Sequence, residues 1–519
     1  MCNFDWREDP VFWDLCDMVA KGNMICLTGA GISKELKNVY GEQLPDWYTL
    51  VSRIYKTMKD NPSIHFSDED EKIISDLLDE HGNDELQEFS DLMKSLSDGN
   101  SSSLSERDRS LIKTVLDRKM LPTKQPCSGD ELVTASSKLR KIDHKLFDEI
   151  LSKLVTTAGQ KTTETHKAIT KLNPKGIMTY NYDTAHEEAW KQEKVKYDMV
   201  IPSSKNEICN LLRNGFHNHP FILKAHGSTD KKGSLVLTSE SYSELFTKYS
   251  YYKPLVQDIL MNHQLLIIGF GMTDPDFDRM IQDLFTAFGS PIQTHIVITH
   301  ENNKSKKDIL YQEKYGFRYL YVKDFSHIPQ ILKECTELPG PYVKQILKEI
   351  VSGGEDEKGV EFRAAAHEKL KKLNNVAKEI VARELKEEIK KAPLQNSDEY
   401  KLLKLDEKVY SFGFLLDESI DKDGSRKEFL IKEVIEKNHD PKVVCHALYQ
   451  IVKYLKKNDL PRIKRWRECF EKETYFTDYG FCDTPLEYMG VDGRREKTSR
   501  NVIYCKFLEA LVYSKFYLR

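Results

Sequence analysis

The sequence predicts an α/β fold, in which a mostly parallel β-sheet carries helices on both faces and an all-α region follows. An apolar run at residues 24–27 leads into a glycine-rich turn, as a buried strand does. From residue 164 to about 340, short apolar runs alternate with helical patterns. Beyond residue 360 the apolar residues recur at helical spacing.

The first predicted strand ends in a candidate ligand site. Residues 28–33, Thr-Gly-Ala-Gly-Ile-Ser, force a tight turn, and the glycines at 29 and 31 let a ligand approach the main chain. A helix that opens near Ile32 and Ser33 would direct free N–H groups and its positive dipole end at that ligand. A diphosphate matches this description, although such a turn is as often only a turn.

Further apolar runs predict the other strands of the sheet. They lie at residues 177–179, 198–201, 221–224, 264–268, 294–299 and 317–322. Asp274 and Pro275 start the helix after the strand at 264–268, because Asp caps helices and Pro is tolerated in their first turn. In such sheets, ligands bind at the carboxyl ends of the strands, where the strand order reverses.

The domain that contains this sheet is predicted to span residues 1–345, with a helical insertion at 60–155. The insertion is polar, lacks strand signals and carries helix-capping sequences at 67–70 and 105–108. It is either a packing module, which we favour, or a lid over the ligand.

A linker and a helical domain are predicted to follow. Residues 346–360 include a Gly- and charge-rich stretch, and a charged helix extends from about 361 to 391. Its apolar seam packs either inside the domain, which is the favoured interpretation, or against a partner helix. The seam consists of Ala366, Leu370, Leu373, Ala377 and Ile380. The helical C-terminal domain, a sensor or assembly region, is predicted for 361–519.

Composition excludes several classes of protein. The 519 residues carry a net charge of only −4, which argues against a nucleic-acid-coating protein. No apolar run is long enough to cross a membrane, and the polar N-terminal residues do not resemble a signal peptide. Ten scattered cysteines without a C-x-x-C pair argue against a zinc ribbon and suit the reducing cytoplasm.

Polar or glycine clusters also follow three later strands. They are Thr179-Tyr-Asn-Tyr-Asp183, Lys224-Ala-His-Gly-Ser228 and Gly269-Phe-Gly-Met-Thr-Asp274. Because the carboxyl ends of parallel strands meet at one edge, these clusters and the first glycine turn are expected to surround one ligand.

Together and in this order, the motifs resemble the sirtuin catalytic domain. The resemblance covers residues 10–340 and is carried by Gly29-Ala-Gly-Ile-Ser33 with Leu44-Pro-Asp-Trp47, by Thr179-Tyr-Asn-Tyr-Asp183, by His226-Gly227 and by Gly269-Phe-Gly271. It implies a Rossmann-like sheet that binds NAD.

Departures from the sirtuin pattern point to one branch of the family. Deacetylating sirtuins carry a four-cysteine zinc module between the His-Gly motif and the later glycine turn, whereas residues 227–269 contain no cysteine. Tyr182 and Asp274-Pro-Asp276 look like the sirtuin-like proteins of bacterial anti-phage defence, which hydrolyse NAD. The resemblance thus implies an NAD glycohydrolase without zinc that depletes NAD when triggered. It also implies a homo-oligomer, with an ATPase or a phage-sensing protein as a possible partner.

Two residues are predicted to be catalytic. Asn181 can hold a ribose hydroxyl or orient a water molecule, and His226 titrates in the range of a general base. Asp183 either holds the ribose or caps the helix that follows it. Gly29, Ala30, Gly31 and Ser33 are predicted to take the diphosphate, and Gly269, Phe270 and Gly271 to line the adenosine side. Asp46 and Trp47 either touch the ribose side or simply pack. Ile32 and Thr179 are also predicted to bind the cofactor, without an assigned part of it.

Two other functions stay open. A zinc-free protein deacylase or ADP-ribosyltransferase would need an acceptor for turnover. A sensor of NAD or ADP-ribose would bind its ligand intact and signal through the C-terminal region.

Overall fold

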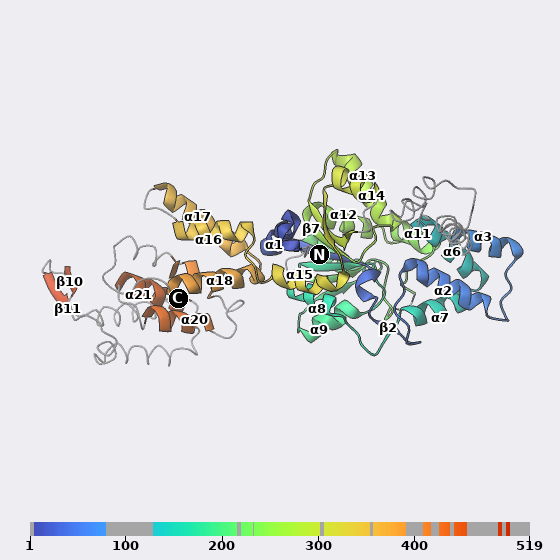
Figure 1. Ribbon diagram of the computed structural model, residues 1–519, viewed down its shortest axis with the longest axis horizontal. Helices are drawn as coiled ribbons and strands as arrows, with labels where there is room; N and C mark the ends of the chain where they lie inside the picture. Colours follow the sequence, from blue (N-terminus) through green and yellow to red (C-terminus); the bar gives the residue numbers. More distant parts are fainter. Residues whose placement is uncertain are drawn as a thin grey trace, which may run out of the picture. The chain divides into compact units, whose positions relative to one another are not determined.

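The structure is a computed structural model. It describes residues 5–78, 128–214, 219–231, 233–301, 306–352, 357–390, 408–409, 411–416, 425–435, 441–453, 486–489 and 495–498. The chain divides into two compact units (Figure 1). One consists of Asn23–Gln330, and the other consists of Met1–Gly22 together with Ile331–Arg519.

A seven-stranded sheet forms the centre of the first unit. Its strand order is β5-β6-β4-β1-β7-β8-β9, and every pairing is parallel. The predicted parallel sheet is therefore confirmed. The strands are β1 (Met24–Thr28), β4 (Gly176–Thr179), β5 (Asp198–Val200), β6 (Phe221–Lys224), β7 (Gln264–Ile268), β8 (His295–His300) and β9 (Phe317–Val322).

Helices cover both faces of this sheet, as predicted. All five residues of β1 are buried, which requires cover on each side. In Figure 1, α12 (Tyr252–Asn262), α13 (Pro275–Phe288) and α14 (Lys306–Tyr315) lie above the strands, and α8 (Glu164–Lys171) and α9 (Ala185–Gln192) lie below. Two further helices, α10 (Lys205–Asn214) and α11 (Ser239–Thr247), contact α12.

The strand order places a ligand crevice beside β1. From β1 the chain moves to its neighbour β4 and outward to β5 and β6, and it then crosses to β7 on the other side of β1. The order thus reverses at β1 and β7, and their carboxyl ends flank the position where α/β sheets bind ligands.

A small helical bundle adjoins the sheet. It contains α2 (Trp47–Lys59), α3 (Asp68–Leu78), α6 (Gly129–Ile142) and α7 (His144–Val155), the last three of which lie within the predicted insertion. The bundle has an apolar core of its own, built from residues such as Ile54, Leu139 and Leu151. The capping sequence predicted at 105–108 lies outside the described residues.

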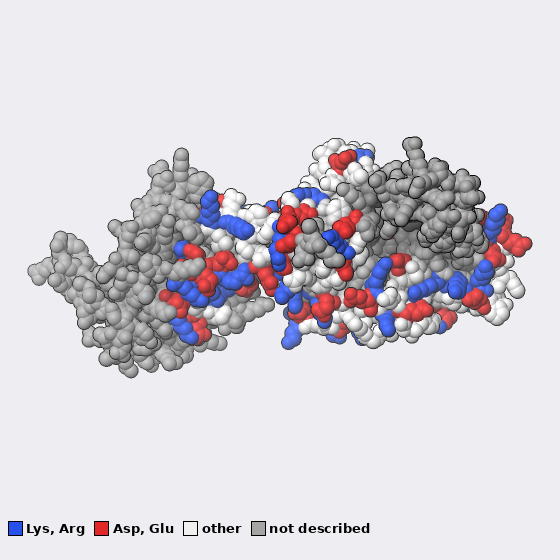
Figure 2. Space-filling view, viewed as in Figure 1, with Lys and Arg blue, Asp and Glu red and all other residues white. Residues whose placement is uncertain are grey.

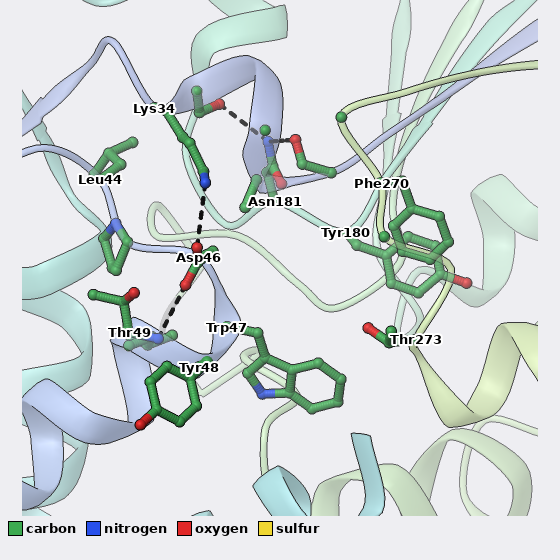
Figure 3. A pocket seen from close by; sticks show the side chains of 18 of the residues that line it. Lys34, Leu44, Asp46, Trp47, Tyr48, Thr49, Tyr180, Asn181, Phe270 and Thr273 are labelled. Atoms are coloured by element: carbon green, nitrogen blue, oxygen red, sulfur yellow. Dashed lines mark hydrogen bonds and ion pairs between the residues drawn. The ribbon is translucent and has the colours of Figure 1, made fainter. Parts of the chain in front are cut away.

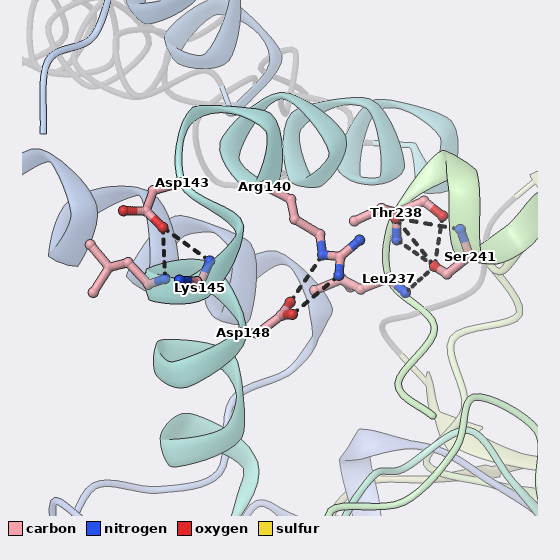
Figure 4. A network of polar contacts seen from close by, with 8 residues as sticks. Arg140, Asp143, Lys145, Asp148, Leu237, Thr238 and Ser241 are labelled. Carbon is pink, nitrogen blue, oxygen red and sulfur yellow. Dashed lines mark hydrogen bonds and ion pairs between the residues drawn. The ribbon is translucent and has the colours of Figure 1, made fainter. Parts of the chain in front are cut away.

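Polar contacts fix the ends of these helices (Figure 4). Asp143 caps α7 by accepting the N–H of Lys145 at 3.0 Å, and Arg140 donates to Asp148 at 3.0 Å. The backbone N–H of Ser239 donates to the Ser137 hydroxyl at 2.8 Å. This last bond joins the bundle to α11 of the sheet domain.

The second unit combines the first helix of the chain with the C-terminal region. Helix α1 (Pro10–Lys21) packs with α16 (Pro341–Ser352) and α18 (Asn375–Lys390), and Asp17 accepts the N–H of Tyr342 at 2.9 Å. The unit also contains α17 (Glu357–Lys372), α20 (Ser425–Leu430) and α21 (Pro441–Lys453). All five residues of the predicted seam lie in its buried core, so the seam packs inside the unit.

The C-terminal region differs from the sequence-based expectation in three ways. Helices α16 and α17 occupy much of the predicted linker, because Val343, Ile346 and Ile350 form a buried apolar face. The predicted helix 361–391 is two helices, since Asn374 starts a new one by accepting the N–H of Val376 at 3.2 Å. The region is also not entirely α-helical, because β10 (Leu486–Met489) and β11 (Arg495–Thr498) pair antiparallel on either side of a glycine-containing segment.

Basic and acidic side chains are interspersed on the face of the molecule that Figure 2 shows, in agreement with the small net charge. Among the described helices, none combines the length and apolar character that a membrane crossing needs.

Candidate functional site

A cavity of about 690 Å³ opens at the carboxyl ends of β1, β4, β6 and β7. All four motifs contribute side chains or backbone to it. The cavity is lined by Gly29, Ala30, Gly31, Ser33, Lys34, Leu44, Pro45, Asp46, Trp47, Tyr48, Thr49, Leu50, Leu132, Val155, Tyr180, Asn181, Tyr182, Asp183, His226, Gly269, Phe270, Gly271, Thr273, Asp274, Ile298, Thr299 and Phe325.

The two glycine turns pack directly against each other. The N–H of Gly31 donates to the carbonyl of Gly269 at 2.9 Å, and the N–H of Gly29 donates to that of Ile268 at 3.3 Å. A Cβ on Gly31 would lie 2.7 Å from the Cα of Gly269, and Gly269 itself has a φ of +64°. These glycines are therefore needed for the contact between the turns.

The helix predicted to open near Ile32 and Ser33 is not present, and that prediction is wrong. Residues Ala30–Ser33 form only a short 3₁₀ turn, of four residues. The N–H of Ile32 donates back to the carbonyl of Gly29 at 3.3 Å. The turn thus lacks the dipole of a full helix, and the N–H groups of Gly29, Gly31 and Ile32 already have protein partners.

Asn181 and Asp183 are held by the first glycine turn. The amide nitrogen of Asn181 donates to the carbonyl of Gly29 and to the hydroxyl of Ser33, each at 3.0 Å. The Ser33 hydroxyl in turn donates to Asp183 at 2.9 Å. Because its amide nitrogen is engaged twice, Asn181 offers its side-chain oxygen to a ligand.

Asp183 also caps α9, which is one of the two roles that the sequence predicts for it. Its second carboxylate oxygen accepts the N–H of Ala185, the first residue of α9, at 2.9 Å. Both oxygens thus have partners within the protein, and the side chain is buried.

His226 lies at the end of β6 in an enclosed, largely aromatic environment. Its ring meets those of Tyr180 and Tyr242 edge-on, with centroids 4.7 and 5.1 Å away. Its Nε2 lies 3.4 Å from the Asp274 carboxylate. Burial lowers the pKa of the imidazole, and the charge of Asp274 opposes this only in part. The imidazole is therefore neutral near pH 7 and able to accept a proton.

Asp274 caps α13 as predicted, and it also reaches the cavity. One of its oxygens accepts the N–H groups of Asp276 and Phe277 at 3.0 and 3.2 Å. The other accepts the hydroxyl of Tyr242 at 2.7 Å and faces His226. The sequence identified the cap but gave no sign of the second contact.

One group among the described side chains has the geometry to hold a metal ion. Ligand atoms of His226, Asp274 and Asp276 lie within 4.8 Å of one another. The Asp274 carboxylate already accepts several hydrogen bonds, and burial raises the pKa of Asp276 to about 8, with the Asp274 charge contributing. That the protein works without zinc stays a prediction.

Aromatic rings line much of the cavity (Figure 3). Tyr180 stacks on Phe270 with centroids 4.6 Å apart. Trp47 stacks more loosely on Tyr242, at 6.4 Å, from the first turn of α2. These rings offer flat apolar surface to a planar heterocycle.

Comparison with known proteins identifies the domain. Residues 175–320 match the family model described as the SIR2-like domain. The chain carries a SIR2-like domain. This confirms the predicted sirtuin-like family, and the match includes β4 to β8 and most of β9.

The chain also has curated relatives. Each of the following is called NAD(+) hydrolase ThsA. The Enterococcus faecium protein is 25% identical over 32% of this chain and 35% of its own. The Bacillus cereus (strain MSX-D12) protein is 22% identical over 36% of this chain and 37% of its own length. The Cytobacillus dafuensis protein is 22% identical over 38% of this chain and 38% of its own length. The chain thus spans less than two fifths of the length of these relatives.

Most of the predicted site residues meet in the cavity. The exceptions are Ile32, which packs on Gly269, and Thr179, which is fully buried and accepts the N–H of Asn181 at 3.1 Å. Residues that were missed include Lys34 and Tyr180. Both are neighbours in sequence of predicted residues, and this adjacency was the available signal.

Proposed function

We propose that this protein is an NAD glycohydrolase, which converts NAD and water to nicotinamide and ADP-ribose. The observation that carries the proposal is that Asn181 and His226 line one cavity, together with both glycine turns. The relatives named as NAD(+) hydrolases support the choice of reaction. A cavity of about 690 Å³ is within the range that small-molecule ligands occupy.

The chemistry demands little of the protein. The bond between the ribose C1′ and the nicotinamide nitrogen breaks, and its electron pair neutralises the departing pyridinium. The transition state at C1′ resembles an oxocarbenium ion, as in other glycosyl transfers. The site has to hold the ribose and deliver one water oxygen to C1′.

Asn181 and His226 match these two tasks. The free amide oxygen of Asn181 is suited to accept a hydrogen bond from a ribose hydroxyl or from the water, because its nitrogen is held by Gly29 and Ser33. His226 is buried and neutral, so it is suited to take the proton that the water loses. That proton then passes to solvent.

Turnover by the purified full-length chain tests the proposal. Free nicotinamide and ADP-ribose would be followed by chromatography. We expect His226→Ala and Asn181→Ala each to reduce the rate at least about 100-fold, which is the typical contribution of a positioned acid–base group. His65→Ala is the matched control, because His65 is exposed and does not line the cavity.

Thermal unfolding of each variant checks that the fold is retained. NAD that binds and stays intact under all conditions would favour the sensor instead. Turnover only in the presence of an acylated or nucleophilic acceptor would favour the deacylase or transferase.

The resemblance to anti-phage proteins extends the proposal to a biological role. We infer that the chain depletes NAD in phage-infected cells, and that assembly or a partner protein holds it inactive otherwise. Cellular NAD measured during infection, with wild type and His226→Ala compared, tests this role. Constant NAD in both strains would contradict it.

A further inference from the structure

The cavity presents a charge problem for a dinucleotide. A diphosphate carries about two negative charges at neutral pH, and three carboxylate side chains line the cavity, those of Asp46, Asp183 and Asp274. His226 offers no positive charge, because burial lowers its pKa. Three N–H groups of the expected anion site, those of Gly29, Gly31 and Ile32, donate to protein carbonyls and are therefore not available to a phosphate.

Lys34 is the one cation that lines the cavity among the residues described by the structure. It follows directly after the 3₁₀ turn of residues 30–33. Its ammonium group lies 3.3 Å from a carboxylate oxygen of Asp46, and the two side chains are 57% and 44% exposed. Figure 3 shows this ion pair between the two side chains.

Asp46 is held in place independently of Lys34. Its other oxygen accepts the N–H of Thr49 at 3.0 Å and so caps α2. The carboxylate is therefore fixed by the helix, whereas Lys34 has a flexible side chain that can move to another anion.

We propose that Lys34 binds the diphosphate of the dinucleotide. Without ligand, the Lys34 ammonium group pairs with Asp46, and on binding the phosphate replaces the Asp46 carboxylate as its partner. The proposal rests on the proposed function, because it assumes that a dinucleotide enters this cavity. An exposed ion pair contributes little net stability, so exchanging its carboxylate for a phosphate costs little. The diphosphate gains the cation that the glycine turn does not supply.

Binding titrations of the full-length chain test this without requiring turnover. ADP-ribose is the ligand with phosphates, and adenosine is the ligand without them. We expect Lys34→Gln to weaken ADP-ribose binding by about 10- to 100-fold, the usual effect of losing a charge-assisted hydrogen bond, and to leave adenosine binding unchanged. The salt dependence of ADP-ribose binding should decrease as well.

Asp46→Asn provides the opposite change. Asparagine caps helices as well as aspartate does, so α2 is retained while the competing charge is lost. ADP-ribose should bind about two- to fivefold more tightly. Lys59→Gln is the matched control, because Lys59 also has an exposed carboxylate partner, Glu71, but lies outside the cavity.

Each result decides between the two proposals. Equal ADP-ribose affinity in wild type and Lys34→Gln overturns the role of Lys34 and leaves the NAD-hydrolase proposal standing. Equal losses for ADP-ribose and adenosine also overturn it, because a general defect of the cavity then explains them. Wild type that binds no dinucleotide overturns both.

Discussion

At the scale of single residues, Asp274 connects the helix after β7 to the imidazole of His226. One of its oxygens caps α13, and the other accepts the Tyr242 hydroxyl and faces Nε2 of the histidine. Helix and tyrosine fix the carboxylate, which lies 3.4 Å from an Nε2 that has no hydrogen-bond partner among the described residues.

Asp276 yields a prediction about pH. Burial and the neighbouring Asp274 charge raise its pKa to about 8, and Arg279 opposes this in part. Below about pH 4 the group is protonated in both folded and unfolded chains. As the pH rises towards 8 the unfolded chain ionises first, so the free energy of unfolding falls by up to about 1.4 kcal/mol per pH unit. Above pH 8 Asp276 is ionised in both states, and the free energy of unfolding falls no further on its account.

The variant Asp276→Asn removes this dependence. We expect its stability relative to wild type to increase steadily between pH 5 and pH 8. Urea unfolding at pH 5, 6.5 and 8 measures the difference. A difference that stays constant over this range would show that Asp276 is ionised in the folded protein.

At the scale of elements, the contact between the two glycine turns predicts an asymmetry among glycines. A methyl group on Gly31 would lie 2.7 Å from the Cα of Gly269, so the turns would have to separate. On Gly271 the nearest atom would be 3.7 Å away. We expect Gly31→Ala to cost about 1–3 kcal/mol of stability and Gly271→Ala to cost little.

Melting temperatures of the two variants measure this difference. Equal melting temperatures would mean that the turns separate freely. Turnover and ADP-ribose affinity, measured on the same samples, distinguish loss of the fold from intrusion into the cavity.

The sequence could predict the elements of the sheet domain but not all the contacts between them. Local signals sufficed for strands such as 264–268 and for the Asp274 cap, because apolar runs and capping residues act within a few positions. The contact of Gly31 with Gly269 joins residues distant in sequence. The four motifs therefore identified the cavity, whereas the role of its glycines and the reach of Asp274 towards His226 needed coordinates.

Long-range packing also explains the errors outside the cavity. Asn374 interrupts the predicted helix 361–391, and its N–H donates to the carbonyl of Ala20 in α1 at 2.9 Å. Nothing near residue 374 in the sequence indicates that partner. The described parts of the predicted linker are helical for the same reason, since the cluster that buries Ile346 and Ile350 includes residues from distant segments.

At the scale of the whole molecule, the chain divides into two compact units, and each contains a buried apolar cluster. One core surrounds the sheet, and the other gathers Ala20 with residues from α16 to α21. Two compact units, each with an apolar cluster, predict two unfolding transitions. Only the unit of Asn23–Gln330 contains the cavity, so only its transition should respond to ligand.

Calorimetry with ADP-ribose and one core variant can assign the two transitions. ADP-ribose at 100 times its Kd should raise the free energy of unfolding of the unit that binds it by about 2.7 kcal/mol. Leu370 is fully buried in the other unit. Leu370→Ala should lower the free energy of unfolding of that unit by about 2–5 kcal/mol and leave the affinity for ADP-ribose unchanged. If a single transition shifts with both changes, the units unfold together and the C-terminal region is coupled to the cavity. Two independent shifts would mean that any control of turnover by that region requires a partner or assembly.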